Sequence, residues 1–182
     1  MRNASNFSTS ILNSTTPYID YMFRRATPDD LPAIMALLEM GRQTMRNNGN
    51  TFQWNGYPTE NQILADIADG NSYLICHNGT PVATFAMIIG EEPTYKTIYN
   101  GQWLDDTLPY ATIHRLAGNP RYKGLGKICF DWVWQNIHNI RFDTHRCNPI
   151  LRHIAETNGF IYCGIIHLAN GDEWLAFQNI EN

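Results

Sequence analysis

Apolar residues recur along the chain with two periods, one typical of helices and one typical of strands. Leu31, Ile34, Met35 and Leu38 repeat at three- and four-residue spacing, as they would on one face of a helix. Shorter β-branched and aromatic runs between turn residues predict strands. The predicted order is βααβββαβαββ, with strands at 21–25, 72–77, 80–89, 110–117, 141–145, 160–168 and 173–178, and helices after Thr27, after Thr59, at 125–138 and after Asn148.

Turn and cap residues set the limits of these elements. Thr27 with Pro28 after it and Asp30 three residues on predicts a capped helix start. Residues 41–57 are rich in Asn, Gly and Gln and predict a loop after that helix. Residues 90–109 form a second long segment, and loops of this length are usually functional or mobile.

A run of antiparallel strands followed by a βαβα stretch predicts an α/β (α+β) fold, in which helices cover the faces of a mixed sheet. The 182 residues fit one domain, which we place at 21–182 because no linker or repeat interrupts it. Half of residues 1–20 are Asn, Ser or Thr, and we expect this segment to be a flexible N-terminal tail.

Composition narrows the classes of function. The net charge is -4 and no basic block occurs, which argues against nucleic acid as a partner. The longest apolar run, 82–89, is too short to span a bilayer. The four cysteines form no C-x-x-C pair, so we expect reduced thiols in a cytoplasmic protein.

A metal site is weighed and not predicted. Asp143, His145 and Cys147 alternate, so on a strand their side chains would share a face. Nothing in the sequence supplies a fourth ligand.

The most informative segment is a glycine turn between the strand at 110–117 and the helix at 125–138. It reads R-x-x-G-x-G, with Gly124 and Gly126 as its glycines. Glycines let a backbone approach a ligand closely, and the N–H groups and dipole of a helix start attract anions. Arg121, Lys123 and Lys127 add positive charge. The turn therefore predicts a pyrophosphate site.

Other interpretations of this turn are weaker or fail. Gly124 and Gly126 could simply allow a tight turn and close helix packing. A dinucleotide-binding fingerprint needs a third glycine, and Phe130 stands near that place. A phosphate-binding P-loop needs Ser or Thr after the Gly-Lys pair, and Ile128 follows here.

The turn, in this order of elements, resembles the acetyl-coenzyme A motif of the GCN5-related N-acetyltransferases. Residues 23–30 resemble that family's opening strand and helix cap, and Asn148 followed by Gly159 resembles its closing helix and strand. Residues 109–117, 143–145 and 162–166 resemble a bacterial branch of the family with unassigned substrates. The resemblance implies a mostly antiparallel sheet of six to seven strands, about four helices, and a fourth and fifth strand that splay apart.

The resemblance also implies roles for particular residues. Acetyl-coenzyme A would be the co-substrate, with no metal. The cofactor's pantetheine arm and pyrophosphate would contact the end of the fourth strand, the turn and a helix cap, namely Leu116, Ala117, Arg121, Tyr122, Lys123, Gly124, Leu125, Gly126, Lys127 and Asn148. The aromatic segments 52–57 and 95–103 would wall the pocket of an amine acceptor, either a small molecule or a peptide.

The sequence departs from the family at two catalytic positions. Thr112 stands where many members carry a general-base glutamate, and Ala155 stands where many carry a general-acid tyrosine. We therefore predict His114 as the base, because it lies on the strand beside the thioester and histidine titrates near neutrality. His145 is the second candidate, and we read Glu91 and Glu92 as a solvated turn pair.

These departures keep a second function open. The chain could bind acyl-coenzyme A as a sensor without catalysing transfer. The sequence is compatible with a homodimer and does not define the acceptor.

Overall fold

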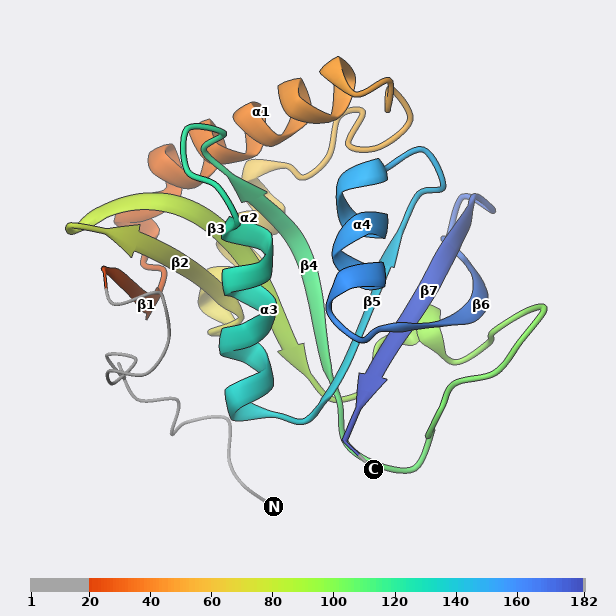
Figure 1. The fold of residues 1–182 in the computed structure, drawn as a ribbon. Coiled ribbons are helices and arrows are strands. Elements are labelled where there is room, and N and C mark those ends of the chain that lie inside the picture. The colour runs from red at the N-terminus through yellow and green to blue at the C-terminus, as the bar shows by residue number, and fades with distance from the viewer. Residues whose placement is uncertain (1–19, 182) are drawn as a thin grey trace.

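The structure is a computed structural model that describes residues 20–181, and it contains one seven-stranded sheet (Figure 1). The strand order is β1-β2-β3-β4-β5-β7-β6, with β4 and β5 parallel and every other pair antiparallel. The strands are β1 (Tyr21–Arg25), β2 (Ser72–His77), β3 (Thr80–Ile89), β4 (Ala111–Gly118), β5 (Asn139–Thr144), β6 (Ile161–His167) and β7 (Glu173–Ile180). The α-helices are α1 (Leu31–Asn47), α2 (Glu60–Ala68), α3 (Leu125–Asn136) and α4 (Pro149–Thr157).

Helices cover both faces of the sheet (Figure 1). Alternate residues of β2 show why: Tyr73 and Ile75 join the core beneath α3 and α4, whereas Leu74 and Cys76 join the core beneath α1 and α2. The predicted order of elements and the mixed sheet with helices on its faces are confirmed. Only Asp20 of the predicted tail, residues 1–20, falls within the part that the structure describes.

The predicted loop at 41–57 is wrong at its start, because α1 continues to Asn47. Gly41 explains the error. A Cβ atom at this position would lie 2.9 Å from Cβ of Ala117, so glycine lets the helix pack closely on β4. Gly41, which suggests a loop in the sequence, therefore allows close packing of α1 on β4 in the structure. A 3-10 turn, Pro28–Asp30, leads into α1, and Thr27 caps this turn: its backbone N–H donates to Asp30 Oδ2 at 2.8 Å, as the capping pattern predicts.

Strands β4 and β5 pair over two residues only, Ala111 with Ile140 and Thr112 with Arg141. Beyond Thr112 the two strands separate, and α3 and α4 follow the diverging edges (Figure 1). The splayed pair of strands expected from the sequence is confirmed. The edge of β4 that faces β5 is consequently left without a strand partner from residue 113 onward.

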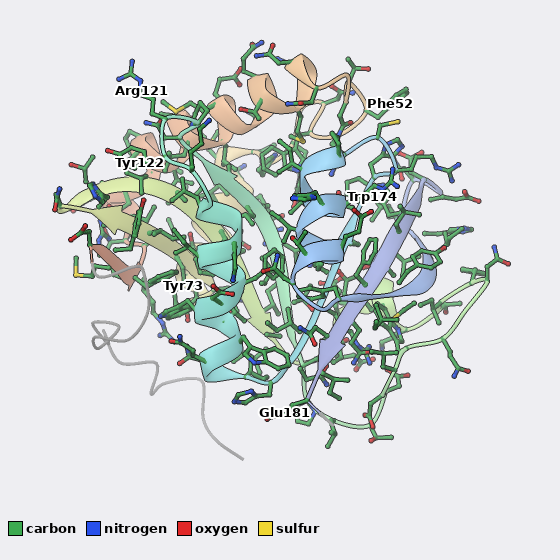
Figure 2. All side chains as sticks on the ribbon, in the orientation of Figure 1. Phe52, Tyr73, Arg121, Tyr122, Trp174 and Glu181 are labelled. Carbon is green, nitrogen blue, oxygen red and sulfur yellow. The ribbon has the colours of Figure 1, made fainter. Side chains whose placement is uncertain are left out.

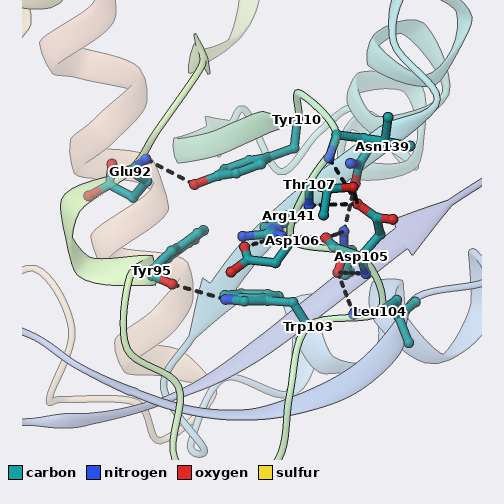
Figure 3. A network of polar contacts seen from close by, with 12 residues as sticks. Glu92, Tyr95, Trp103, Leu104, Asp105, Asp106, Thr107, Tyr110, Asn139 and Arg141 are labelled. Carbon is teal, nitrogen blue, oxygen red and sulfur yellow. Dashed lines mark hydrogen bonds and ion pairs between the residues drawn. The ribbon is translucent and has the colours of Figure 1, made fainter.

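A buried arginine packs the segment 90–109 against the face of β5 and β7 that lies opposite α3 and α4. Arg141 is 1% exposed, and its guanidinium lies between the rings of Trp103 and Tyr110, 4.1 and 3.9 Å from their centres (Figure 3). It donates to the carbonyl oxygen of Asp105 at 2.6 Å and pairs with Asp106 at 2.9 Å. These contacts fix the second half of the segment. Its first half is tied to the same rings, because the Trp103 indole donates to the carbonyl oxygen of Tyr95 at 2.9 Å and the backbone N–H of Glu92 donates to the Tyr110 hydroxyl at 3.0 Å.

No helix within residues 20–181 has the length and apolar character to cross a bilayer. No group of three or more His, Cys, Asp or Glu side chains there is arranged to hold a metal ion. Asp143, His145 and Cys147 do not share a strand face, because β5 ends at Thr144.

Replacing Arg141 with Met should destabilise the fold by about 2–3 kcal/mol, since it removes two ring contacts and two charge-assisted hydrogen bonds at a buried site. Urea unfolding followed by circular dichroism measures the change. Arg146→Met is the matched control, because Arg146 pairs with Glu173 on an exposed surface, and it should change stability by less than about 0.5 kcal/mol. Equal losses in both variants would contradict the anchoring role.

Candidate active site

Strand β4 carries a β-bulge where it leaves β5. Ala86 pairs with His114 and Thr84 with Ala117, so Phe85 alone opposes both Arg115 and Leu116. Arg115 has a φ of 54°, in the left-handed region that a non-glycine residue rarely adopts. A bulge bends its strand and increases the local twist, which widens the separation from β5 that begins after Thr112.

A buried ion pair holds Arg115 in this conformation. Its Nε lies 2.8 Å from Asp66 Oδ2, its Nη2 donates to Asp66 Oδ1 at 2.9 Å, and its Nη1 donates to the Tyr57 hydroxyl at 2.6 Å. The two charged side chains are 8% and 7% exposed. A left-handed residue costs about 1–2 kcal/mol, and this forked pair from α2 offsets that cost.

The glycine turn leads from β4 into α3 and presents amide groups at the helix start. The N–H groups of Arg121 and Tyr122 are used within the turn, since they donate to the side chain and carbonyl of Asn119. The first bond of the helix runs from Ile128 N–H to Gly124 C=O at 2.9 Å. The N–H groups of Gly124, Leu125 and Gly126 precede this bond and have no acceptor within the helix, as at other helix starts.

The two glycines of the turn meet different structural requirements. Gly124 has a φ of 75°, and a Cβ there would meet nothing within 4 Å. A Cβ on Gly126 would lie 2.4 Å from Cδ1 of Ile154 in α4, so this residue allows close helix packing. The simple packing interpretation weighed from the sequence therefore describes Gly126, whereas Gly124 keeps the turn in a left-handed conformation beside open space.

The three cations expected at the turn are placed differently. Lys123 is exposed and lines the adjoining groove. Lys127 also lines it, and its Nζ pairs with Asp131 at 2.7 Å. The side chain of Arg121 points away from the groove, toward solvent at the outer edge of the turn (Figure 2).

A groove of about 1440 Å³ runs from this turn to the place where β4 and β5 part. One wall includes residues predicted from the sequence to contact a cofactor, namely Leu116, Ala117, Tyr122 through Lys127, and Asn148. Its opposite end contains His114, Glu92 and Asp143. One continuous groove therefore connects an amide-rich, lysine-bearing turn with a cluster of titratable side chains.

His114 lies between two carboxylates in that cluster. Its Nε2 is 3.1 Å from Glu92 Oε2, a hydrogen-bond distance, and its Nδ1 is 3.9 Å from Asp143 Oδ1. The buried Tyr95 hydroxyl donates to the same Asp143 oxygen. The side chains of His114, Glu92 and Asp143 are 20%, 15% and 8% exposed, so each is largely removed from water.

Burial and hydrogen bonds set the charge of these groups. Burial tends to raise the pKa of Glu92, but hydrogen bonds from His114 and Thr94 outweigh it and lower that pKa to about 2. Burial raises the pKa of Asp143, and the pairing with His114 and the Tyr95 hydroxyl oppose that rise. Burial next to Asp143 raises the pKa of Tyr95 well above its usual value, so Tyr95 remains a donor.

Glu92 and Asp143 are the functional candidates that sequence reasoning missed. Glu92 is not the solvated turn residue we expected, because Pro93 starts a short helical turn that Glu92 caps through Thr94, while Glu91 remains exposed and pairs with Lys96. Asp143 could have been noticed as an acidic residue inside an otherwise buried strand. Glu92 lies 22 residues before His114 in the sequence and Asp143 lies 29 residues after it, and no local sequence pattern predicts contacts over such separations.

The second predicted base, His145, is not among the residues that line the groove. It stacks on Phe52 with ring centres 5.1 Å apart, and its Nδ1 accepts from the backbone N–H of Cys147. Burial lowers the pKa of His145. The structure thus brings His114, and not His145, to the point where the two strands part.

The positions usual for acid and base residues are closed off. Thr112 and Ala155 are 0% and 1% exposed and lie in the packed interior. Asn148 lines the groove and also caps α4. Its Oδ1 accepts from Leu151 N–H, which is the capping bond, and its Nδ2 donates to Gln53 Oε1 at 3.0 Å.

Of the two aromatic segments, only the first lines the groove. Phe52, Trp54 and Tyr57 border it, and Phe52 lies with Trp174 near the end of α4 that faces the turn (Figure 2). Tyr95 and Trp103, which belong to the second segment, are instead buried in the small core that the segment 90–109 forms with β6 and β7.

Comparison with solved structures identifies the family. A GNAT-family acetyltransferase from Streptococcus agalactiae is 33% identical, with 89% of this chain and 96% of that chain covered and a TM-score of 0.81. The ribosomal-protein-S18-alanine N-acetyltransferase of Escherichia coli shares the fold at 14% identity, with 87% and 92% covered and a TM-score of 0.58. Arabidopsis thaliana Naa50, solved with the bisubstrate analogue CoA-Ac-MVNAL, does so at 13% identity, with 89% and 99% covered and a TM-score of 0.58.

No protein-family model and no curated protein matches the sequence. The assignment rests on the 33% identity over most of both chains, together with the splayed strands and the glycine turn. The chain belongs to the GCN5-related N-acetyltransferase (GNAT) family.

Proposed function

We propose that this protein transfers an acetyl group from acetyl-coenzyme A to a primary amine of a small molecule or peptide by direct displacement. The observation that carries the proposal is the single groove that joins the glycine turn to His114 at the parting of β4 and β5. A phosphate-binding helix start at one end and a base at the other match the two halves of the reaction.

The cofactor would lie along the splayed edge of β4. Its pyrophosphate would accept hydrogen bonds from the amides at the start of α3, next to Lys123. Its pantetheine arm would pair with the free backbone of Leu116 and Ala117, as an added strand does. A backbone N–H near the Arg115 bulge would polarise the thioester carbonyl.

The chemistry requires the removal of two protons from an acceptor that arrives as an ammonium ion. His114 takes one proton and releases the neutral amine. The amine nitrogen then forms a bond to the acetyl carbon, and the bond from that carbon to sulfur breaks. The second proton leaves the nitrogen for the departing thiolate, which gives an amide, free coenzyme A and one proton on His114. Holding both reactants in place supplies up to about 7–11 kcal/mol of the lowering of the barrier.

One observation favours the alternative, a protein that binds acyl-coenzyme A without turnover. Thr112 and Ala155 are buried where many family members carry the acid and base. A thiol-release assay with a panel of primary amines separates the two functions. Release with at least one amine supports the enzyme, whereas tight coenzyme binding without release supports the sensor.

Replacing each of the two candidate histidines with alanine tests which of them is the base. His114→Ala should lower kcat about 10²–10⁴-fold without a change in coenzyme A affinity, because it removes the base and leaves the turn intact. His145→Ala should keep most of the kcat, since His145 stacks on Phe52 outside the groove lining. Steady-state thiol release measures both variants. Full activity of His114→Ala, or the larger loss in His145→Ala, would reverse the assignment.

Substitution of Gly124 tests the cofactor site. Gly124→Val should raise the Kd of coenzyme A about tenfold or more, which corresponds to about 1.4 kcal/mol, because a branched side chain would block the approach to the helix amides. Gly79→Val is the matched control. Gly79 has a φ of 78°, has nothing within 4 Å of its Cβ position, and lies in the β2–β3 hairpin.

Both variants force a branched residue into a left-handed conformation, so both should lose comparable stability. Only Gly124→Val should lose affinity in isothermal titration calorimetry. Unchanged affinity in that variant would remove the pyrophosphate from this turn.

A further inference from the structure

The two carboxylates beside His114 bind it differently, and the difference assigns its two nitrogens. Glu92 is ionised, because its pKa is lowered to about 2, and an ionised carboxylate can only accept hydrogen bonds. The contact of 3.1 Å therefore requires a proton on Nε2 of His114. In the neutral imidazole, the other nitrogen, Nδ1, then carries the lone pair.

That lone pair faces a second acceptor. Nδ1 lies 3.9 Å from Asp143 Oδ1, which is too long for a direct hydrogen bond. A single nitrogen with several N–H donors, placed beside the line that joins these two atoms, can reach both at about 2.9 Å. An oxygen with two lone pairs can also accept from the Tyr95 hydroxyl at the same time.

We propose that Asp143 receives the acceptor in its ammonium form and that Nδ1 of His114 is the nitrogen that takes its proton. This inference rests on the proposed function and adds the substrate class to it: aliphatic primary amines that are cationic at neutral pH, in preference to neutral aromatic amines. Asp143 is then a substrate-binding residue, Glu92 fixes the tautomer of His114, and Tyr95 fixes the Asp143 carboxylate.

The charges around Asp143 support this arrangement. His114 and Arg115 from β4, Glu92 from the segment after β3, and the Tyr95 hydroxyl face it. The guanidinium of Arg115 is already paired with Asp66, so it neutralises Asp143 only weakly. An ammonium ion bound beside Asp143 and Glu92 is consequently attracted by two carboxylates whose side chains are only 8% and 15% exposed.

Nitrogen NMR of the His114 imidazole tests the proposal in the full chain loaded with coenzyme A. The signal is assigned through His114→Gln. Butylammonium should shift the Nδ1 signal in a saturable way, whereas tetramethylammonium, a cation without N–H donors, should not. Asp143→Asn should weaken the response to butylammonium about tenfold or more, as expected for loss of a charged hydrogen-bond partner.

Tyr95→Phe supplies a second variant, which keeps the aromatic ring and leaves the Asp143 side chain in place. Loss of the hydroxyl donor should raise the pKa of Asp143 further, so the binding of butylammonium should begin at a higher pH than in the wild type. The readout is the pH dependence of the same NMR shift, which a purely structural role of Tyr95 would leave in place.

Equal responses to the two cations, an unchanged response in Asp143→Asn, or no response to butylammonium would each overturn the proposal. Calorimetric titration with coenzyme A is performed on the same samples. If coenzyme A binds and the ammonium does not, only this inference fails. If coenzyme A does not bind, the proposed function fails with it.

Discussion

The short pairing of β4 with β5 is the constraint on which the rest of the site depends. Two residue pairs hold the strands together, and the bulge at Arg115 and Leu116 then turns β4 away. This separation leaves a free strand edge, directs α3 and α4 along the two sides, and places His114 opposite Asp143. The forked ion pair between Arg115 and Asp66 stabilises the bulge, so a residue of α2 that lines the groove also supports the strand that forms its opposite side.

A second set of contacts holds the polar cluster from the other side. Arg141 packs between Trp103 and Tyr110, and the Tyr110 hydroxyl accepts from the backbone N–H of Glu92 at 3.0 Å (Figure 3). The segment 90–109 therefore behaves as a fixed strap and not as a free loop. Because the side chain of Glu92 ends on His114, the geometry of the base depends on an arginine that does not itself line the groove.

Local patterns predicted most of the fold and part of the site. Caps, turn glycines and periodicity are short-range, so they predicted every strand and helix and the turn before α3, but not every boundary. The helix predicted at 125–138 ends at Asn136, and the strand predicted at 141–145 runs over Asn139–Thr144. Gly41 misled the prediction because its role is a contact with Ala117, 76 residues away. Glu92 and Asp143 were not recognised for the same reason, since their importance arises only when the sheet brings them to His114. Arg121 fits the motif in sequence, yet its side chain points to solvent.

Hydrogen–deuterium exchange with and without acetyl-coenzyme A tests the central claim most directly, because that claim concerns backbone amides left free by the parting of β4 and β5. We predict slower exchange at residues 114–117 and 123–127 when the cofactor is bound, with no change in β1 or in the β2–β3 hairpin. Unchanged exchange along β4 and the turn, at saturating cofactor, would contradict it.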